Sequence, residues 1–385
     1  MDGVKLADRT DLIEESVTIA LNAKAKKLAR GGRKIYNFTA GELDTETPVY
    51  IQEYVNKKLS LNKYTPTAGL PELKQLIADH NENLYGLSWI KSENIVVTSG
   101  AKPAIYVALL SLINPGDEVI VPIPAWVSYI DLIKLVGGVP VTVELKPNFD
   151  LDSKAVKRAI TSKTKLVILT SPHNPTGSIF SKKELTDLTN TINEKNIFVM
   201  ADEIYNKLVF DIEYFPVPNA GFKKLVIING FSKSQALTGW RIGYLIAPKR
   251  VAEAATAMLS HINGNAPLIS QYAGIAAMQR NDKPPAANLE HIESNLKIAY
   301  ELLKDISDIE TNNPGGAFYI YLDLRRITNN SLVWCEKLIE NYGVALVPGE
   351  AFMTPGFARL TYSGNTETLV KGIKQIAKSL RSENA

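Results

Sequence analysis

Short apolar, β-branched segments recur along the chain from about residue 95, and stretches with helical periodicity separate several of them. Seven such segments predict strands, at residues 94–98, 117–122, 139–145, 164–170, 197–201, 224–229 and 243–248. Residues 102–113 and 181–196 repeat apolar positions with a helical period. Wholly apolar strands that alternate with helices are typical of a parallel sheet buried on both faces. The pattern therefore predicts an α/β fold whose large domain carries a mostly parallel, seven-stranded sheet between helices.

The pattern changes toward the C-terminus, where residues 317–324 and 344–349 predict strands of a smaller α+β domain. The polar stretch at 279–291 contains Pro284 and Pro285, which break any continuous helix, so the crossing between domains is expected there. Residues 11–32 predict an N-terminal helix closed by Gly31 and Gly32, packing with the C-terminal part. We expect a large domain at 46–284 and a small domain formed by 1–45 and 285–385.

Composition narrows the class of protein. The 385 residues are 45% hydrophobic, which is ample for a large core. The net charge is +3, with 43 basic and 40 acidic residues and no block of one sign, so neither nucleic acid nor an anionic membrane is an expected partner. The single cysteine, Cys335, cannot form an internal disulfide, which fits a reducing compartment. With no signal-peptide pattern and no apolar run near ~20 residues, we expect a cytoplasmic protein.

Ligands of parallel sheets bind beyond the carboxyl ends of the strands, so the residues that follow each strand are the candidates for chemistry. Ser99, Gly100, Ala101 and Lys102 follow the first strand and lead into a helix, which makes a backbone cradle for phosphate or an ordinary turn. Trp126 follows the second strand and could stack on a flat ring or serve in packing.

The next two strand ends carry polar side chains. The loop "SPHNPTG" at 171–177 presents the Asn174 amide, which could also cap its own turn, while His173 is expected to pack within the loop. Asp202, Glu203 and Tyr205 follow the strand at 197–201. A carboxylate at the end of a buried strand needs a cation or a protonated ring nitrogen as its partner. For Glu203, a salt bridge or a helix N-cap is the plainer interpretation.

The stretch "NGFSKSQALTGWRIGY" at 229–244 places Lys233 and Arg241 after the sixth strand. A desolvated lysine among cations becomes a free amine, and an arginine can bind phosphate with two hydrogen bonds. Gly239 is expected to turn the backbone so that both cations face one crevice. Together, the strand ends supply what a phosphorylated aromatic aldehyde bound to lysine would need, which describes pyridoxal 5′-phosphate, PLP.

The sequence resembles the class I/II aminotransferases of PLP fold type I, and most of all the prokaryotic aspartate aminotransferase branch. The motifs that carry the resemblance run in the family's order over nearly the whole chain: "NAKAKKL", "FTAGELDTETP", "KYTPTAGLPELKQLI", "VVTSGAKPAIYVAL", "SPHNPTG", "ADEIY", "FSKSQALTGWRIGY", "PGGAFYIYLDL" and "ARLTYS".

The resemblance implies a role for each matched residue. Lys233 matches the Schiff-base lysine that also moves the substrate's proton, and Asp202 matches the partner of the pyridine nitrogen. Tyr205 and Asn174 match the groups bonded to the cofactor's phenolic oxygen, and Trp126 matches the stacking aromatic. The matches to the phosphate site are Gly100, Ala101, Lys102, Ser232 and Arg241.

Further matches concern the substrate and the subunit arrangement. Arg359 matches the arginine that binds the α-carboxylate, with help from Asn174, and Gly41 matches a backbone contact from the mobile small-domain segment. Tyr64 matches a tyrosine that reaches the phosphate in the neighbouring subunit, which implies a homodimer with shared active sites. No metal is implied.

Substrate choice depends on fewer residues. Lys102 matches a cation for a distal carboxylate, or is a solvated first-turn lysine. Thr18 matches a hydroxyl that helps to close the site, and Trp126 also favours the aspartate type. We therefore expect aspartate and 2-oxoglutarate as substrates of a ping-pong reaction. The segment at 260–271 departs from the branch at Asn263, Gly264 and Asn265, which leaves aromatic, alanine and prephenate specificities open.

Other classes share this fold. β-Lyases, decarboxylases and aminocyclopropane-carboxylate synthases use the same lysine. A non-enzymatic regulator with an aminotransferase-like domain would carry an added DNA-binding module, for which the segment before the first matched motif is too short.

Overall fold

The computed structural model describes residues 5–13, 17–210, 212–280 and 282–383 of the chain. The helices are α1 (Val17–Arg30), α2 (Val49–Asn56), α3 (Pro71–Tyr85), α4 (Ala101–Leu112), α5 (Ser128–Leu135), α6 (Ser153–Ala159), α7 (Lys182–Glu194), α8 (Lys249–Ile262), α9 (Leu268–Met278), α10 (Ala286–Leu303), α11 (Ser331–Tyr342) and α12 (Thr366–Glu383). Short 3-10 helices lie at Asp8–Leu12, Ser92–Asn94, Val217–Ala220 and Gly349–Phe352.

The largest sheet has the strand order β2-β8-β7-β6-β5-β3-β4. Its strands are β2 (Ile95–Thr98), β3 (Glu118–Ile123), β4 (Val139–Glu144), β5 (Thr164–Thr170), β6 (Phe198–Asp202), β7 (Leu225–Gly230) and β8 (Gly243–Ile246). β8 is antiparallel to both of its neighbours, and the other strands all run in one direction. The predicted seven-stranded, mostly parallel sheet and the helices at 102–113 and 181–196 are confirmed.

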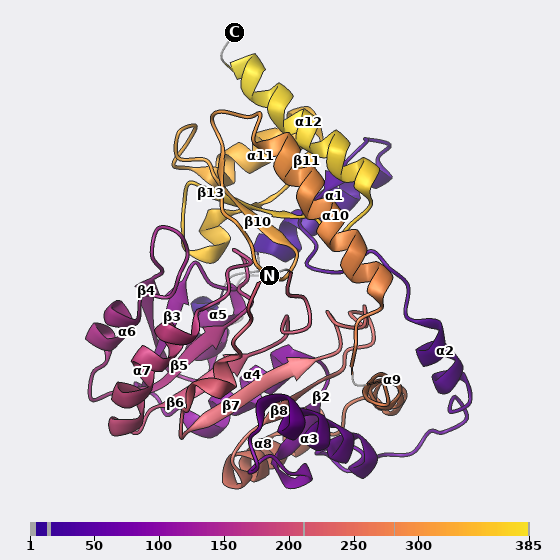
Figure 1. The fold of residues 1–385 in the computed structure, drawn as a ribbon, viewed down its shortest axis with the longest axis vertical. Coiled ribbons are helices and arrows are strands. Elements are labelled where there is room, and N and C mark those ends of the chain that lie inside the picture. The colour runs from indigo at the N-terminus through magenta and orange to yellow at the C-terminus, as the bar shows by residue number, and fades with distance from the viewer. Residues whose placement is uncertain (1–4, 14–16, 211, 281, 384–385) are drawn as a thin grey trace.

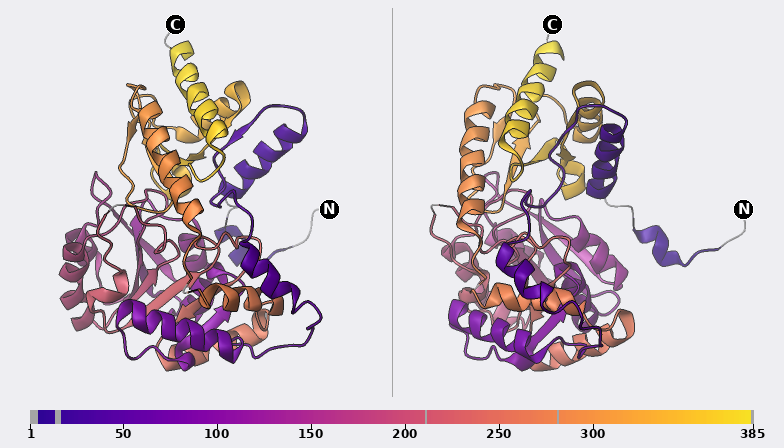
Figure 2. Two further views of the ribbon diagram at one scale, coloured as in Figure 1. Left: turned by 45° about the vertical axis from the view of Figure 1, so that its right-hand side comes forward. Right: turned by 90° about the vertical axis from the view of Figure 1, so that its right-hand side faces the viewer.

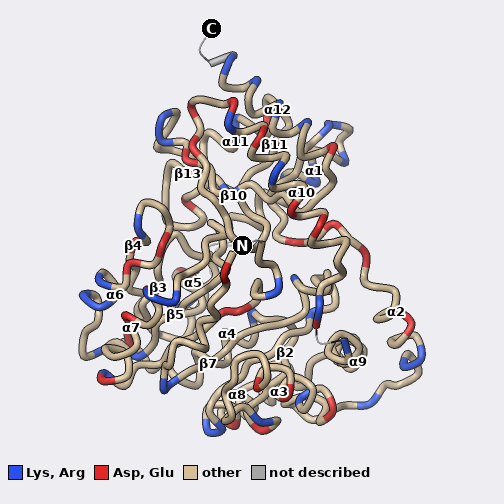
Figure 3. The backbone as a smooth tube through the Cα atoms, in the orientation of Figure 1, with Lys and Arg blue, Asp and Glu red and all other residues tan. Residues whose placement is uncertain are grey.

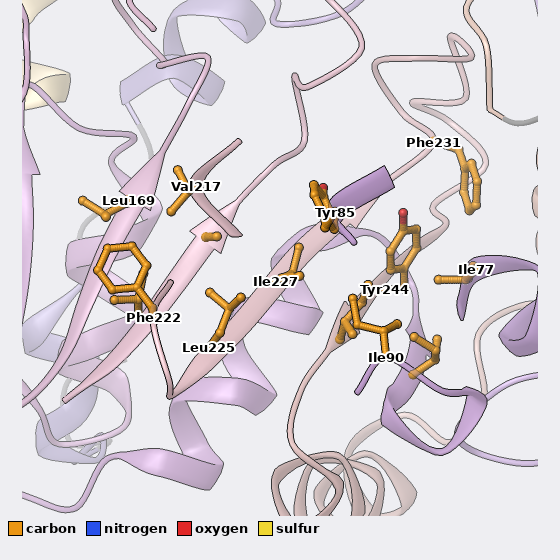
Figure 4. Packing of buried hydrophobic residues seen from close by; sticks show 14 of the residues in the cluster. Ile77, Tyr85, Ile90, Leu169, Val217, Phe222, Leu225, Ile227, Phe231 and Tyr244 are labelled. Carbon is orange, nitrogen blue, oxygen red and sulfur yellow. The ribbon is translucent and has the colours of Figure 1, made fainter. Parts of the chain in front are cut away.

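Successive side chains of each strand point to opposite faces of the sheet. Helices cover both faces, so neighbouring apolar residues of one strand are both buried. Leu225 and Ile227 of β7 belong to a buried cluster with residues of α2, α3, α7 and α9, part of which is drawn in Figure 4. Val226 and Ile228 belong to a second cluster, with residues of α4, α5 and α8. Burial of each such side chain stabilises the fold by about 1.5–3 kcal/mol. The wholly apolar segments of the sequence therefore reflect a strand that is covered on two sides.

A second sheet has the antiparallel order β12-β13-β10-β9, with β9 (Glu310–Thr311), β10 (Tyr319–Asp323), β12 (Val347–Pro348) and β13 (Phe357–Thr361). It lies with α10, α11 and α12 at the top of Figure 1, above the seven-stranded sheet. Figure 2 shows α1 and α10 on opposite sides of this upper part. A separate parallel pair joins β1 (Tyr36–Asn37) to β11 (Val344–Ala345).

The strand predicted at 344–349 is therefore two short strands in different sheets. Val344 pairs with Tyr36, while Val347 pairs with Arg359. Pro348 has no backbone N–H to donate, which limits the hydrogen bonds between β12 and β13.

The N-terminal helix begins later than predicted. Ile13 is extended, with φ −129° and ψ 130°, so the helix cannot run continuously from residue 11, and residues 14–16 lie outside the described part. Its end is as expected: Gly31 N–H donates to the Lys27 carbonyl at 3.1 Å, and Gly32 has φ +86°. Ala25 of α1 packs with Ile339 and Ala345, which confirms the expected contact with the C-terminal part.

The connection between α9 and α10 interrupts the helical pattern near the two prolines, as predicted, and Pro285 is the N-cap of α10. Basic and acidic residues are interspersed along the whole backbone trace (Figure 3). In the described part of the chain, no helix has both the length and the apolar character needed to cross a membrane.

Candidate active site

The loops after β2, β3, β5, β6 and β7 leave the large sheet at the same edge, because these strands run in one direction. Arg359 reaches this edge from β13, and Gly41 and Thr18 reach it from the N-terminal region. The result is a cavity of about 370 Å³. Its lining includes most of the predicted site residues: Thr18, Gly41, Ala101, Lys102, Trp126, Asn174, Asp202, Tyr205, Ser232, Lys233, Arg241 and Arg359.

Lys233 lies in the loop after β7, and its Nζ donates a hydrogen bond of 2.5 Å to the Gly41 carbonyl. Burial lowers the pKa of Lys233 to about 8, and the positive charges of Arg359 and Arg241 act in the same direction. Glu42 and Asp202 oppose the shift. The amine is therefore closer to its neutral, nucleophilic form than an exposed lysine would be.

Asp202 ends β6 and is fully enclosed. The Tyr129 hydroxyl donates to its Oδ2 at 2.5 Å, and the Ile204 N–H donates to its Oδ1 at 3.2 Å. Burial raises the pKa of Asp202 to about 6, while the hydrogen bonds from Tyr129 and Ile204 hold it lower than burial alone would. Among the described residues, both hydrogen bonds to this buried carboxylate come from neutral donors, and the charge of Lys233 lowers its pKa only as the last of the causes, so the site suits a ligand that brings a protonated nitrogen.

Arg359 and Asn174 form a second polar centre. Arg359 Nη1 donates to Asn174 Oδ1 and Nη2 donates to the Thr39 carbonyl, each at 2.9 Å. The buried guanidinium lies over the rings of Tyr319 and Phe352, at 4.4 and 5.2 Å from their centroids. Its Nε is buried and has no hydrogen-bond partner among the described residues.

The phosphate-cradle prediction concerns Gly100 and Arg241. A Cβ at Gly100 would lie 2.5 Å from Arg241 Nη2, so the turn before α4 and the guanidinium are in close contact. Arg241 Nη1 also donates to the Thr238 carbonyl at 3.1 Å. The Nζ of Lys102, in the first turn of α4, lies 5.0 Å from the Trp126 ring centroid. Burial lowers the pKa of Lys102, and the charge of Arg241 adds to the shift.

Sequence reasoning missed several members of the cavity. Tyr129 and Thr170 face Asp202, with their hydroxyls 2.9 Å apart, and the Tyr319 hydroxyl lies 2.8 Å from that of Tyr205. Burial raises the pKa of Tyr205 well above its ordinary value. For Tyr129, its position three residues after Trp126 is the only local signal in the sequence.

Two predicted residues do not line the cavity. Gly100 lies behind Arg241, and Tyr64 is 98% exposed on the surface of the chain. Asn263, in the segment that departs from the branch, donates to Ser99 Oγ at 3.3 Å and lies outside the cavity lining.

The expectation for Gly239 is wrong. Its φ is not positive and a Cβ there would meet open space; the left-handed positions of the loop are Ala236 and Arg241, with φ +55° and +54°.

The two remaining candidates are structural. Glu203 accepts hydrogen bonds from the Tyr214 phenol and from the Val217 N–H, in place of the expected salt bridge or cap, and burial raises its pKa to about 8. His173 bonds Thr176 Oγ1 at 2.8 Å and packs near Phe180, in keeping with its expected packing role. Among the described residues, no group of three or more His, Cys, Asp or Glu side chains could hold a metal ion.

Comparison with known proteins places this arrangement in a family. The family model described as aminotransferase class I and II matches residues 33–376. An aspartate aminotransferase of Thermotoga maritima is 37% identical over 380 residues, covering 97% of this chain and 99% of that protein. An aspartate/prephenate aminotransferase of Thermus thermophilus is 35% identical, covering 97% of this chain and 98% of its own.

Solved structures agree with the sequence relatives. The structure of an aspartate aminotransferase from Thermus thermophilus with maleate superposes with a TM-score of 0.93 at 35% identity, over 98% of this chain and 100% of that chain. The fold is that of fold type I, with a large, mostly parallel sheet between helices and a smaller α+β part. The chain therefore belongs to the class I and II aminotransferases.

Proposed function

We propose that this aminotransferase uses PLP to transfer the amino group of aspartate to 2-oxoglutarate by a ping-pong mechanism. The observation that carries the proposal is the single cavity in which Lys233, Asp202, Arg241 and Arg359 converge. An amine of lowered pKa, a buried carboxylate and two arginines are the groups that a phosphorylated pyridine aldehyde and a carboxylate substrate require.

The residues present fit the cofactor. The missing side chain of Gly100 lets the Arg241 guanidinium lie against the turn before α4, and Arg241 and Ala101 both line the cavity, where they would hold the phosphate. Asp202 would hold the ring nitrogen, Trp126 would stack on the ring, and Asn174 and Tyr205 would bond its phenolic oxygen. Ala101, Lys102 and Ser232 border the same region, and Lys233 would be the point of attachment.

PLP supplies, when bound, an electron-accepting ring that makes the Cα proton of an attached amino acid acidic. Arg359 would bind the α-carboxylate from the cavity lining, with its guanidinium oriented by Asn174 and by the Thr39 carbonyl. The Lys233 amine, whose pKa is lowered in the same cavity, would serve as the base that accepts the Cα proton of the substrate. Gly41 and Thr18, which line the cavity from the N-terminal region, contribute to its closure.

The aspartate assignment depends on Lys102, Trp126 and Thr18. A dicarboxylate needs a second cation, and the Lys102 ammonium faces the Trp126 ring at the cavity wall. Support comes from the relatives named aspartate aminotransferase and from the Thermus thermophilus structure that holds maleate, a dicarboxylate.

The larger organisation is part of the same proposal. Residues 46–284 form the large domain, and residues 1–45 with 285–385 form the small domain that moves toward it. Two chains form a homodimer in which Tyr64 of one chain binds the phosphate in the other. The exposure of Tyr64 supports this arrangement, and the single cysteine supports a cytoplasmic location.

The test is steady-state kcat/KM for aspartate, alanine, phenylalanine and tyrosine with 2-oxoglutarate as acceptor, and for aspartate and glutamate with prephenate as acceptor. Aspartate is expected among the best donors, and Lys102→Ala is expected to lower its kcat/KM by about 10–100-fold, because a charge-assisted hydrogen bond is lost. The alanine value should stay within about twofold.

Lys195→Ala, at an exposed position after α7, is the matched control and should leave both values unchanged. The assignment fails if aspartate is a poor donor or if Lys102→Ala leaves its value unchanged. Release of pyruvate and ammonia in place of glutamate would identify a lyase instead.

A further inference from the structure

The loop that carries Lys233 is hydrogen-bonded to a buried carboxylate outside the cavity lining. Asp282, in the connection between α9 and α10, accepts hydrogen bonds at its Oδ1 from Ser234 Oγ at 2.8 Å and from Gln235 Nε2 at 3.1 Å. Ser234 and Gln235 directly follow Lys233 in the sequence. All three polar side chains are buried, so each depends on the others for its hydrogen bonds.

Gln235 extends the attachment to two further segments. Its Nε2 also donates to the Lys283 carbonyl at 2.8 Å, and its Oε1 accepts from the Tyr50 hydroxyl of α2 at 2.8 Å. The amide thus joins the Lys233 loop to α2 and to the connection between α9 and α10. A fully buried amide with both ends bonded has one orientation, which fixes the backbone that carries it.

The loop needs such an attachment. Ala236 and Arg241 both occupy the left-handed region, at φ +55° and +54°, and residues with a side chain stay there only when their surroundings hold them. Within the loop, the Gln235 and Leu237 N–H groups donate to the Phe231 carbonyl at 3.1 and 3.4 Å. Loss of the side-chain contacts would leave the strained turn held by hydrogen bonds within the loop, such as these two.

The positive charge of Lys207, in the segment after β6, offsets part of the negative charge of Asp282. Burial raises the pKa of Asp282 to about 6, and the positive charge of Lys207 opposes this shift. The Lys207 Nζ lies 3.1 Å from His80 Nε2 of α3. The Asp282 carboxylate therefore contacts the loop of Lys233 and also interacts electrostatically with Lys207, in the segment that follows Tyr205.

We propose that Asp282 is a positioning residue that holds the Lys233 amine in place through Ser234 and Gln235. The inference rests on the proposed function, since that function gives Lys233 its task. Asp282 is not among the residues that line the cavity, so its effect on Lys233 must pass through the loop.

The first measurement needs no activity. In the full-length, PLP-free protein, Asp282→Ala is expected to raise amide hydrogen exchange in residues 232–238 about tenfold or more, because buried donors lose their acceptor. Asp282→Asn retains an acceptor oxygen and should stay within about threefold of the original protein. Leu188→Ala, a buried site in α7, is the control: it lowers stability and should leave exchange at 232–238 unchanged relative to the rest of the chain.

The second measurement uses the PLP-loaded enzyme. Asp282→Ala should lower kcat about tenfold with KM for the donor changed less than about threefold, and it should shift the pH at which the absorbance of the lysine-bound cofactor changes. Asp282→Asn should restore most of both. Unchanged exchange in Asp282→Ala, or an equal loss of kcat in Leu188→Ala at matched stability, would overturn the proposal. Absence of transamination in the unaltered protein, with the predicted change in exchange, would instead refute the proposed function.

Discussion

At the scale of single residues, burial of Lys233 destabilises its charged form and favours the neutral amine that the proposed reaction needs. Its ammonium is enclosed beside Arg359 and Arg241, and its pKa falls to about 8 from an ordinary 10.5. Among the described residues, the Gly41 carbonyl alone accepts a hydrogen bond from it, at 2.5 Å. The charged form is therefore less stable in the fold than in water, and the native state of the cofactor-free protein bears that cost.

Lys233→Met should accordingly stabilise the cofactor-free protein. Below pH 8 both folded and unfolded chains carry the proton, and the lowering of the pKa from 10.5 to about 8 on folding corresponds to about 3 kcal/mol of lost stability. Between pH 8 and 10.5 the folded lysine is neutral while the unfolded one is charged, so this cost falls as the pH rises and is absent above 10.5. The variant should be more stable by about 3 kcal/mol at pH 7, with an advantage that disappears toward pH 10.5.

Urea unfolding of both proteins at several pH values measures this difference. Lys195→Met, at an exposed position, is the control and should show no pH-dependent advantage. An advantage for Lys233→Met that is absent at pH 7, or constant up to pH 10, would contradict the electrostatic account.

At the scale of elements, the turn from β2 into α4 and the loop after β7 together form the proposed phosphate site. Gly100 is the N-cap of α4 with φ +98° and ψ 168°, a conformation that side chains disfavour. Its missing Cβ lets the Arg241 guanidinium lie against the turn. The helix N-terminus and the arginine charge thus act at the same point, which is what phosphate binding needs.

Gly100→Ala should weaken PLP binding about 10–100-fold, because the new methyl displaces Arg241 and strains the turn. Equilibrium titration with PLP and with pyridoxal, which lacks the phosphate, separates the two ends of the cofactor. Pyridoxal binding should change much less. Gly116→Ala imposes a similar strain, at φ +85° with open space around the Cβ, and should leave PLP binding unchanged. Equal losses for PLP and pyridoxal would mean that the turn does not act through the phosphate.

At the scale of the whole molecule, apolar and aromatic side chains stand exposed between α2 and α3. Tyr64 is 98% exposed, and Leu59 and Leu61 are 61% and 42% exposed. Exposed apolar groups in one segment indicate an interaction surface. They support the proposed homodimer, in which Tyr64 completes the partner's phosphate site.

Mixed dimers test this sharing. Refolding Lys233→Ala with Tyr64→Ala subunits places both defects in one site and leaves the other site intact. An equal mixture assayed at limiting PLP should therefore recover about a quarter of the original activity, since half of the dimers are mixed and each holds one intact site. Lys233→Ala mixed with Arg241→Ala is the matched control and should recover none, because both groups act in their own chain's site. Failure of the first mixture to exceed its components would exclude a shared site.

The sequence by itself determined the strands of the large sheet and the polar residues after them, because apolar periodicity and turn chemistry are local. It also placed Lys233, Asp202, Asn174 and Arg241 at one edge, since parallel strands end together. Arg359 and Tyr64 came from the family resemblance, as no local pattern marks them.

Tertiary structure alone decided which groups support these residues. Tyr129 meets Asp202 across 73 positions, Tyr319 meets Tyr205 across 114, and Asp282 meets Ser234 across 48. It also decided where α1 begins and how residues 344–349 divide between two sheets. Such contacts form only when distant segments pack together, so no periodic pattern in the sequence indicates them.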